Sequence, residues 1–387
     1  MSTAEHLPAG QQRPAGADAP PSPATTPAPV VLPEGVRPVS EIADLKPGAQ
    51  CPDPGSAGSE ITTRAAAARI PLKVGLTLSY TWKGHADDYE HECLTQVTQI
   101  DGRSILTENS CPSGPKHVVT RSTRRLCLSN MADSHLYLTG TWYKYPETFV
   151  GALNFNLSVA SFAALKGRGE FRHSYVNLYD TGFAYSDHYI DGTLRSEGSG
   201  TFKVMINGKI TEVPTIEASS WGQKNGDRIR IKVLDDAAFP LMLDYYIPSM
   251  DKFFITYSKI SYPTAHDLEQ ELSLDKHADI YGIYFDFAQA SLRSESEPVL
   301  QEIAAAMQAH PDWKLVINGH TDNVGTDPEN LALSRQRSQT VRQALIDRYE
   351  VDASRLTTNG FGASQPKEKN DTDRGRALNR RVELIRQ

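Results

Sequence analysis

The spacing of apolar residues changes at about residue 265, and this change limits what the chain can fold into. Residues 72–82 alternate strictly between large apolar side chains and small or polar ones. A period of two residues is typical of strands that bury one face. Similar runs occur at residues 134–143, 202–206, 229–233 and 253–260, with turn signals at Asn207-Gly208 and Asn225-Gly226. The pattern predicts an all-β antiparallel domain over residues 68–264, with one short helix near residues 159–165.

Two architectures fit this β-rich stretch. The first is a soluble sandwich or half-barrel, and the second is an eight-stranded outer-membrane barrel. Charged residues at both ends of the short run 228–232, together with four cysteines in the N-terminal half, favour the soluble module. A proline-rich segment would also be expected after a membrane barrel, whereas here such a segment comes before the strands.

Strand-like and helix-like segments alternate beyond residue 274. A strand is predicted at residues 283–287, and a helix with Pro298 in its first turn is predicted at residues 297–309. A strand at residues 313–318, a second helix, and strands near residues 355–358 and 381–385 follow. We predict an α/β domain of βαβαββ order over residues 274–387, with its helices on one face of the sheet.

The N-terminal segment, residues 1–67, is dominated by Pro, Ala and Gly. Such a segment cannot bury enough apolar surface to offset its ordering entropy, so we expect a disordered tether. No apolar stretch is long enough for a transmembrane helix. The first residues lack the basic and apolar regions of a signal peptide, and we expect that such a signal has been removed.

Charge and cysteine content restrict the partners and the compartment. The formal net charge of −7 argues against a nucleic-acid partner. The four cysteines are even in number and lie in the N-terminal half, which suits one or two disulfides formed in the periplasm. We prefer a bond between Cys93 and Cys111, because a turn at Asp101-Gly102 can bring two short strands together. Cys51 and Cys127 are the other candidates, and all three connectivities stay open.

An acid and a base stand out in the C-terminal part. Asp322 lies in the Gly-flanked string 319–325, and Arg337 follows in a segment with helical spacing. In a helix, Leu333, Arg337 and Val341 share one apolar stripe. An arginine among apolar side chains needs an anionic partner, or its desolvation is not compensated. We therefore expect Asp322 to be that partner.

These two strings, together with residues 283–287 and 379–384, resemble the OmpA-like peptidoglycan-binding domain. The four motifs occur in family order over the last third of the chain. The resemblance implies that Asp322 and Arg337 hold the ammonium and carboxylate at the end of a diaminopimelate residue in the peptidoglycan stem peptide. The other residues that the resemblance assigns to the peptidoglycan pocket are Thr321, Asn323, Asn330 and Arg380.

Ala288 departs from the family pattern. Many members carry Asp or Asn directly after the second aromatic residue of the first strand, and that side chain also reaches the ligand. Either Asp286 or Gln289 takes over this role, or the pocket makes one polar contact fewer.

The expected function is non-enzymatic. The chain would anchor an envelope protein to the cell wall, in the periplasm and close to the outer membrane, with a further protein partner there. Two alternatives stay open: the β domain is a periplasmic enzyme, or it carries a lipid. No cofactor and no metal is expected, because the His- and acid-rich segment 83–92 is interpreted as a loop and His320 as a residue of the pocket rim.

Overall fold

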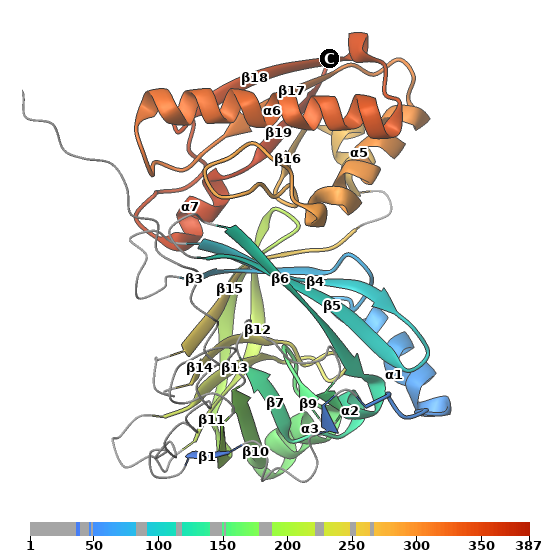
Figure 1. Cartoon of the computed structure of the whole chain (residues 1–387), viewed down its shortest axis with the longest axis vertical. Coiled ribbons are helices and arrows are strands. Elements are labelled where there is room, and N and C mark those ends of the chain that lie inside the picture. The colour runs from blue at the N-terminus through green and yellow to red at the C-terminus, as the bar shows by residue number, and fades with distance from the viewer. Residues whose placement is uncertain are drawn as a thin grey trace, which may run out of the picture.

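The computed structural model describes residues 36–38, 46–47, 49–82, 91–113, 118–139, 149–150, 152–177, 188–220, 228–247, 253–263 and 267–387. Figure 1 shows two sheets, a large one before residue 263 and a smaller one after residue 267, with α5 and α6 covering the smaller sheet. Each part has its own hydrophobic core. Within the part of the chain that is described, no helix combines the length and apolarity needed to cross a membrane.

The large sheet has 13 strands, most of them antiparallel. Their order is β6-β5-β4-β3-β15-β14-β13-β12-β11-β10-β7-β9, and β1 pairs with β11. The bounds are β1 Val36–Pro38, β3 Thr77–Trp82, β4 His91–Ile100, β5 Ser104–Ser113, β6 Val118–Cys127, β7 Leu136–Thr139, β9 Ala152–Leu153, β10 Glu170–Asn177, β11 His188–Ile206, β12 Lys209–Ser220, β13 Arg230–Leu234, β14 Met242–Ile247 and β15 Phe253–Ser261. A separate two-stranded sheet joins β2 (Lys46–Pro47) and β8 (Phe149–Val150).

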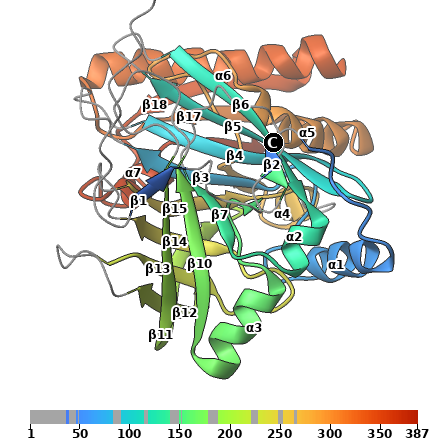
Figure 2. The ribbon, with the colours of Figure 1, turned by 60° about the horizontal axis from the view of Figure 1, so that its bottom comes forward.

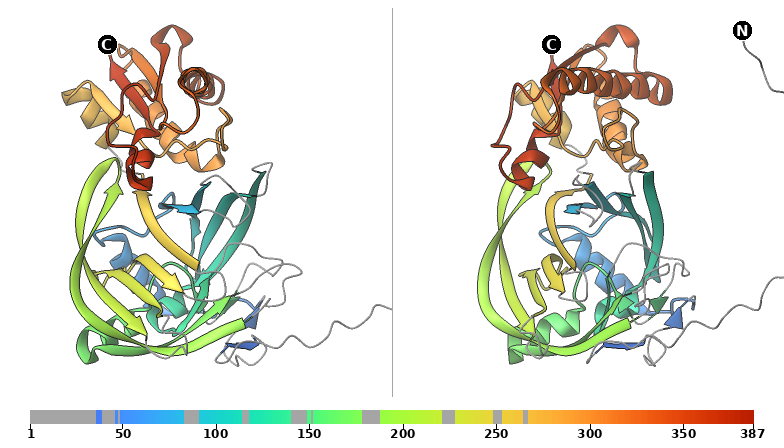
Figure 3. Two further views of the ribbon diagram at one scale, coloured as in Figure 1. Left: turned by 90° about the vertical axis from the view of Figure 1, so that its left-hand side faces the viewer. Right: turned by 60° about the vertical axis from the view of Figure 1, so that its left-hand side comes forward.

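This sheet is strongly curved and wraps around its own core. The end of β11 pairs a second time, with β15, at Met205 and Ile206, which draws five consecutive strands into a ring at that end. Figure 3 shows the curvature, with the C-terminal part over one end of the sheet. Helices α2 (Leu128–Ala132) and α3 (Val159–Arg168) lie near the opposite end (Figure 2). The N-terminal part is thus a large β-rich sheet, and one sheet supplies both of its walls.

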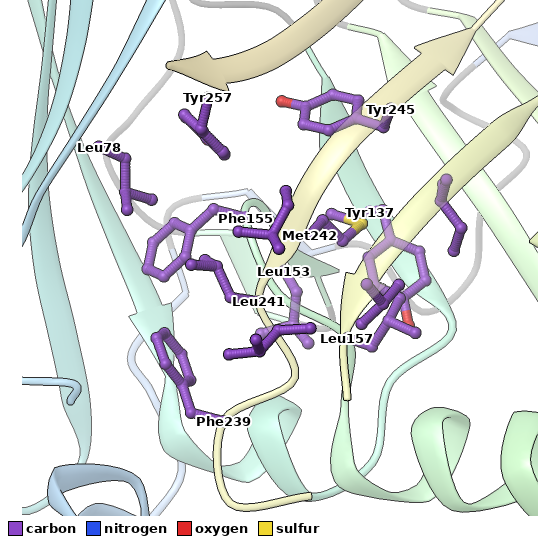
Figure 4. Packing of buried hydrophobic residues seen from close by; sticks show 14 of the residues in the cluster. Leu78, Tyr137, Leu153, Phe155, Leu157, Phe239, Leu241, Met242, Tyr245 and Tyr257 are labelled. Atoms are coloured by element: carbon purple, nitrogen blue, oxygen red, sulfur yellow. The ribbon is translucent and has the colours of Figure 1, made fainter. Parts of the chain in front are cut away.

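Apolar side chains fill the inside of the curved sheet. Figure 4 shows Phe155, Phe239, Leu241 and Tyr257 converging from different segments, and all four are buried. A packed interior of this kind is what stabilises a β domain of this size.

Local signals in this part are confirmed where the structure describes them. Asn207 and Gly208 form the turn between β11 and β12 with φ of 44° and 83°, the left-handed values that a two-residue hairpin needs. The predicted helix near residue 159 is α3, and the side chain of Ser158 caps its N-terminus. The second turn signal, Asn225-Gly226, lies outside the described residues.

The predicted tether is wrong at its C-terminal end. Residues 56–66 form a helix, α1 (Ser56–Ala66), whose Ile61 and Ala65 are buried in the large core. Ile61 and Ala65 are four residues apart and share one face of the helix, and their burial in the core stabilises it. Cys51 is disulfide-bonded to Cys127, which fixes the start of this segment. The second disulfide joins Cys93 to Cys111, the pair preferred from the sequence.

The C-terminal part is an α/β fold with a sheet in the order β16-β19-β17-β18. Its elements are α4 Asp267–Leu274, β16 His277–Ile280, η2 Ser294–Ser296, α5 Glu297–Ala309, β17 Leu315–His320, α6 Asp327–Tyr349, η3 Ala353–Arg355, β18 Leu356–Gly362, α7 Asp373–Asn379 and β19 Val382–Arg386. The βαβαββ order is thus confirmed, with α7 inserted before the last strand. The first strand is β16, however, and residues 283–287 are not a strand.

Two glycines let α6 lie directly on the sheet. A Cβ on Gly319 would come within 2.1 Å of the backbone oxygen of Ser334, and one on Gly360 within 2.4 Å of the backbone nitrogen of Arg335. Only a residue without a side chain permits this approach. At its N-terminus, α6 starts with a capping box between Thr326 and Glu329. The helix that carries Arg337 is therefore held at a fixed depth against β17 and β18.

Candidate functional site

A cavity of about 390 Å³ lies where the two parts of the chain meet. On the C-terminal side its wall comes from the segment 283–288, the end of β17, the following loop, α6 and α7. On the other side it comes from β4, β5 and β15. The volume is in the range of about 300–1,000 Å³ that is usual for small-molecule sites. Six basic residues line it, Lys259, Arg293, Arg337, Arg376, Arg380 and Arg381, against three acidic ones, Glu92, Asp286 and Asp322.

Asp322 sits in this cavity, at the end of β17. Its side chain is buried, and Oδ1 accepts a hydrogen bond of 3.1 Å from the backbone N–H of Val324. Oδ2 accepts one of 2.7 Å from Nη1 of Arg380. The expected pairing with Arg337 is therefore wrong. Arg380 takes that place because β19 runs beside β17 and starts just after this residue.

Arg337 projects from α6 into the same cavity. Its Nε donates to the backbone oxygen of Gln289 at 3.0 Å, and its guanidinium lies 4.8 Å from the ring centre of Phe285. Burial and the nearby Arg380 lower the pKa of Arg337 to about 10, although the negative charge of Asp322 opposes the shift. A cation with too little compensating negative charge attracts an anionic ligand.

The remaining residues of the loop take different positions. Thr321 and Asn330 are buried and line the cavity. Asn330 braces the loop, because its side chain donates to the backbone oxygen of Val324 at 3.1 Å. The hydroxyl of Thr321 has no hydrogen-bond partner among the described residues. Asn323 is exposed and does not contribute to the cavity wall as far as the described residues show.

The segment around Ala288 forms a tight turn at the rim. The backbone N–H of Gln289 donates to the oxygen of Asp286, and the hydroxyl of Ser291 donates to the Asp286 carboxylate at 2.7 Å. Ala288 at the turn has φ of 51°, a left-handed conformation that Asn and Asp adopt more easily than Ala. Asp286 lines the cavity, whereas Gln289 contributes its carbonyl to Arg337.

Glu92 and Lys259 are wall residues that the sequence interpretation missed. They come from β4 and β15 of the large sheet, and they form an ion pair with each other. One signal was available for Lys259: it follows Ile255 and Tyr257 at a period of two, so it belongs to the buried face of its strand. Nothing in the sequence indicated that Glu92 would lie opposite Asp322.

A second cluster of possible metal ligands lies on the small sheet. The ligand atoms of His277, Asp279 and Glu383 are within 4.8 Å of one another. Asp279 already accepts from Nε of Arg381 at 2.9 Å and pairs with Lys367 at 2.7 Å. These cations supply the positive charge that a metal would bring, so the cluster is an ion network.

His320 lies beside this network and lines the cavity. Its ring stacks on Phe361 at 5.3 Å between centroids, and Nε2 is 3.5 Å from a carboxylate oxygen of Glu383. Burial and the charge of Arg381 lower the pKa of His320. A neutral, stacked imidazole of this kind is a packing residue of the cavity wall.

The family match lies in the C-terminal part of the chain. Residues 284–380 match the model of the OmpA family. Outer membrane protein Omp38 of Acinetobacter baumannii is 39% identical over 113 residues, which are 29% of this chain and 32% of that protein. The peptidoglycan-binding protein ArfA of Mycobacterium tuberculosis is 40% identical over 96 residues, 25% of this chain and 29% of that protein.

One solved structure similar to this part is the peptidoglycan-associated lipoprotein from Burkholderia pseudomallei. It has 32% sequence identity, covers 27% of this chain and 88% of that chain, and gives a TM-score of 0.26. The matched segment spans about a third of the length of Omp38. The C-terminal third of the chain thus contains an OmpA family domain, at residues 284–380.

Proposed function

We propose that the C-terminal domain binds peptidoglycan non-covalently and anchors the chain to the cell wall in the bacterial envelope. The ligand group is the zwitterionic end of a diaminopimelate residue in the stem peptide. One observation carries this proposal: Asp322 and Arg337, an anion and an under-compensated cation, line a single cavity of small-molecule size.

The chemistry of this ligand matches the two charges. Diaminopimelate carries an ammonium and a carboxylate on one carbon, so its receptor needs an acceptor and a donor fork close together. A guanidinium forms paired hydrogen bonds with a carboxylate, and a carboxylate accepts from an ammonium. ArfA, which is similar over this segment, is named a peptidoglycan-binding protein.

The decisive experiment compares two synthetic stem tripeptides by calorimetry with the full chain. One ends in meso-diaminopimelate and the other in lysine, which keeps the ammonium but lacks the adjacent carboxylate. Since Arg337 is proposed to bind that carboxylate, we expect the lysine peptide to bind at least thirtyfold more weakly, a difference of about 2 kcal/mol. Equal affinity for the two peptides would reject diaminopimelate as the ligand group.

Variants of the two charged residues test the site itself. Asp322→Asn keeps the size of the side chain, Arg337→Gln shortens it while keeping a polar end, and each removes one charge. Each is expected to lose at least about thirtyfold in affinity for the diaminopimelate peptide, because the ligand charge then lacks its partner. Arg335→Gln is the matched control, since Arg335 is on the same helix but exposed and outside the cavity wall. Retention of purified cell-wall sacculi by both charge variants would refute the assignment of these residues.

A further inference from the structure

The cavity has a second wall that does not belong to the OmpA family domain. Glu92 on β4, Pro112 on β5 and Lys259 on β15 line it from the large sheet. A ligand that reaches Asp322 therefore meets side chains of both parts of the chain. This matters because the C-terminal domain by itself would lack this wall of the site.

The two walls are held in register by a buried contact. Arg293 is almost fully buried, and its Nη1 donates to the backbone oxygen of Glu92 at 3.1 Å. Its Nη2 donates to the backbone oxygen of Ser110 at 3.2 Å and to Glu295 at 3.1 Å. Burial alone would raise the pKa of Glu295, but Arg293 outweighs it and lowers the pKa, so the pair is ionised. A buried, hydrogen-bonded ion pair fixes geometry more than it adds stability.

Glu92 and Lys259 form the ion pair of this second wall, where burial lowers the pKa of Lys259 and Glu92 opposes the shift. Lys259 is almost fully buried, and its ammonium lies 5.0 Å from the ring centre of Tyr284 in the other part of the chain. Burial favours the neutral acid, but Lys259 and Arg380 outweigh it and hold the pKa of Glu92 below its usual range. The large sheet thus presents an ionised carboxylate to the cavity.

A line of alternating charges crosses the junction. Lys259 pairs with Glu92, and Oε2 of Glu92 lies 4.0 Å from Nε of Arg380. Nη1 of Arg380 in turn donates to Asp322 at 2.7 Å. Arg380 therefore stands between two carboxylates, one from each part of the chain.

This arrangement bears on how an ammonium reaches Asp322. The incoming cation has to compete with Arg380 for the carboxylate. Breaking this hydrogen bond has a cost that opposes binding unless a nearby carboxylate compensates it. Glu92 offers the alternative partner, and a shift of about 1 Å would bring it into hydrogen-bond range.

We infer that both parts of the chain form the pocket together. When the ligand binds, Arg380 exchanges its hydrogen bond to Asp322 for one to Glu92, and Asp322 then accepts from the ligand ammonium. This inference rests on the proposed function. Glu92 is a positioning residue that acts through Arg380, and the large sheet is thereby part of the receptor.

The test measures binding of the diaminopimelate tripeptide to the full chain. Glu92→Gln keeps the side-chain size and removes the charge, and it is expected to weaken binding about tenfold. In an Arg380→Gln background the same substitution is expected to change affinity less than twofold, because the group through which it acts is gone. A purely structural role for Glu92 would produce the same loss in both backgrounds.

Controls separate this effect from folding. Glu108→Gln on the neighbouring strand β5 removes a carboxylate that pairs with Arg121 at 3.1 Å outside the cavity, and it should leave binding unchanged. If Glu92→Gln strands Lys259 and does not fold, the double variant Glu92→Gln with Lys259→Gln removes both charges and is expected to fold and to bind about tenfold more weakly.

The outcomes distinguish this inference from the proposed function. Failure of the unaltered chain to bind the tripeptide overturns both. Normal binding of the unaltered chain, with an unchanged affinity of the folded Glu92 variants, overturns the composite pocket alone. Tighter binding by Glu92→Gln also overturns it, because the large sheet would then compete with the ligand.

Discussion

Arg380 donates a 2.7 Å hydrogen bond to Asp322, whereas Arg337 donates to a backbone carbonyl of the rim segment. Arg380 and Arg337 thus depend on Asp322 to different degrees. Asp322 neutralises the charge of Arg380 through a direct hydrogen bond, whereas it acts on Arg337 only through its electrostatic field. Substitutions of Asp322 and Arg337 should therefore affect the stability of the fold differently.

Asp322→Asn should destabilise the fold, and Arg337→Gln should not. Removing the Asp322 charge breaks its 2.7 Å ion pair with Arg380 in a cavity rich in basic side chains, at a cost of about 2 kcal/mol. Removing Arg337 takes away a poorly compensated cation, so the free energy of unfolding should change by less than about 0.5 kcal/mol. Urea unfolding of both variants measures this. A larger loss for Arg337→Gln than for Asp322→Asn would contradict the assigned pairing.

Ala288 offers a gain in stability and a separate gain in binding. Its φ of 51° costs roughly 1 kcal/mol for an alanine, and either Gly or Asn relieves this strain. Both Ala288→Gly and Ala288→Asn should therefore raise the unfolding midpoint. Only Asn adds a polar group at the cavity rim, so it alone should bind the diaminopimelate peptide tighter, by about fivefold for one hydrogen bond. Equal affinities of the two variants would show that this position does not reach the ligand.

Gly319→Ala should damage both stability and binding. Its Cβ would lie 2.1 Å from a backbone oxygen of α6, so the helix has to move outward. We expect a loss of about 2 kcal/mol or more in unfolding free energy and a weaker affinity, because Arg337 moves with the helix. Gly102→Ala is the control, since an added Cβ there meets nothing within 4 Å. Similar unfolding midpoints for the two variants would rule out the close packing of α6.

His173 should make the large sheet sensitive to acid. It is buried, and neither ring nitrogen has a hydrogen-bond partner among the described residues. Burial lowers the pKa of His173 from 6.5 to about 3. The unfolded chain therefore binds the extra proton between these values, and stability falls as the pH drops from about 6.5 towards 3, by about 1.4 kcal/mol per pH unit.

His173→Leu removes this titration. Relative to the unaltered chain, the variant should gain stability on going from pH 7 to pH 5, as followed by thermal unfolding at each pH. A parallel decline of the two proteins with pH would mean that His173 takes up no proton on unfolding.

The sequence predicts an element correctly when the residues that specify it lie within that element. The helix at residues 297–309 coincides with α5, because Pro298 at its start and the spacing of Val299, Leu300 and Ile303 both lie within the segment. The segment 283–287 misled for the opposite reason. It is extended and apolar, but a strand also needs a neighbouring ladder. Phe285 makes only an isolated bridge to Leu292, and the backbone of Tyr284 bonds to the side chain of Ser296.

Only those residues of the site that lie in the C-terminal domain could be predicted from the sequence. Asp322 and Arg337 lie close in the sequence and carry family motifs, so both could be named in advance. Their actual partners are set by register: Arg380 reaches Asp322 because β19 pairs with β17. Glu92 is contributed by a strand 230 residues earlier in the chain, and no periodicity or spacing encodes that approach.

Only five residues separate β15 (Phe253–Ser261) from α4 (Asp267–Leu274). A pull on the C-terminal domain therefore enters the large sheet along β15, which is hydrogen-bonded to β14 on one side and β3 on the other. A force along β15 acts on the hydrogen bonds to both neighbouring strands at the same time, so these bonds share the force and do not break one by one. The strand that carries Lys259 is thus also the covalent connection through which tension passes between the C-terminal domain and the large sheet.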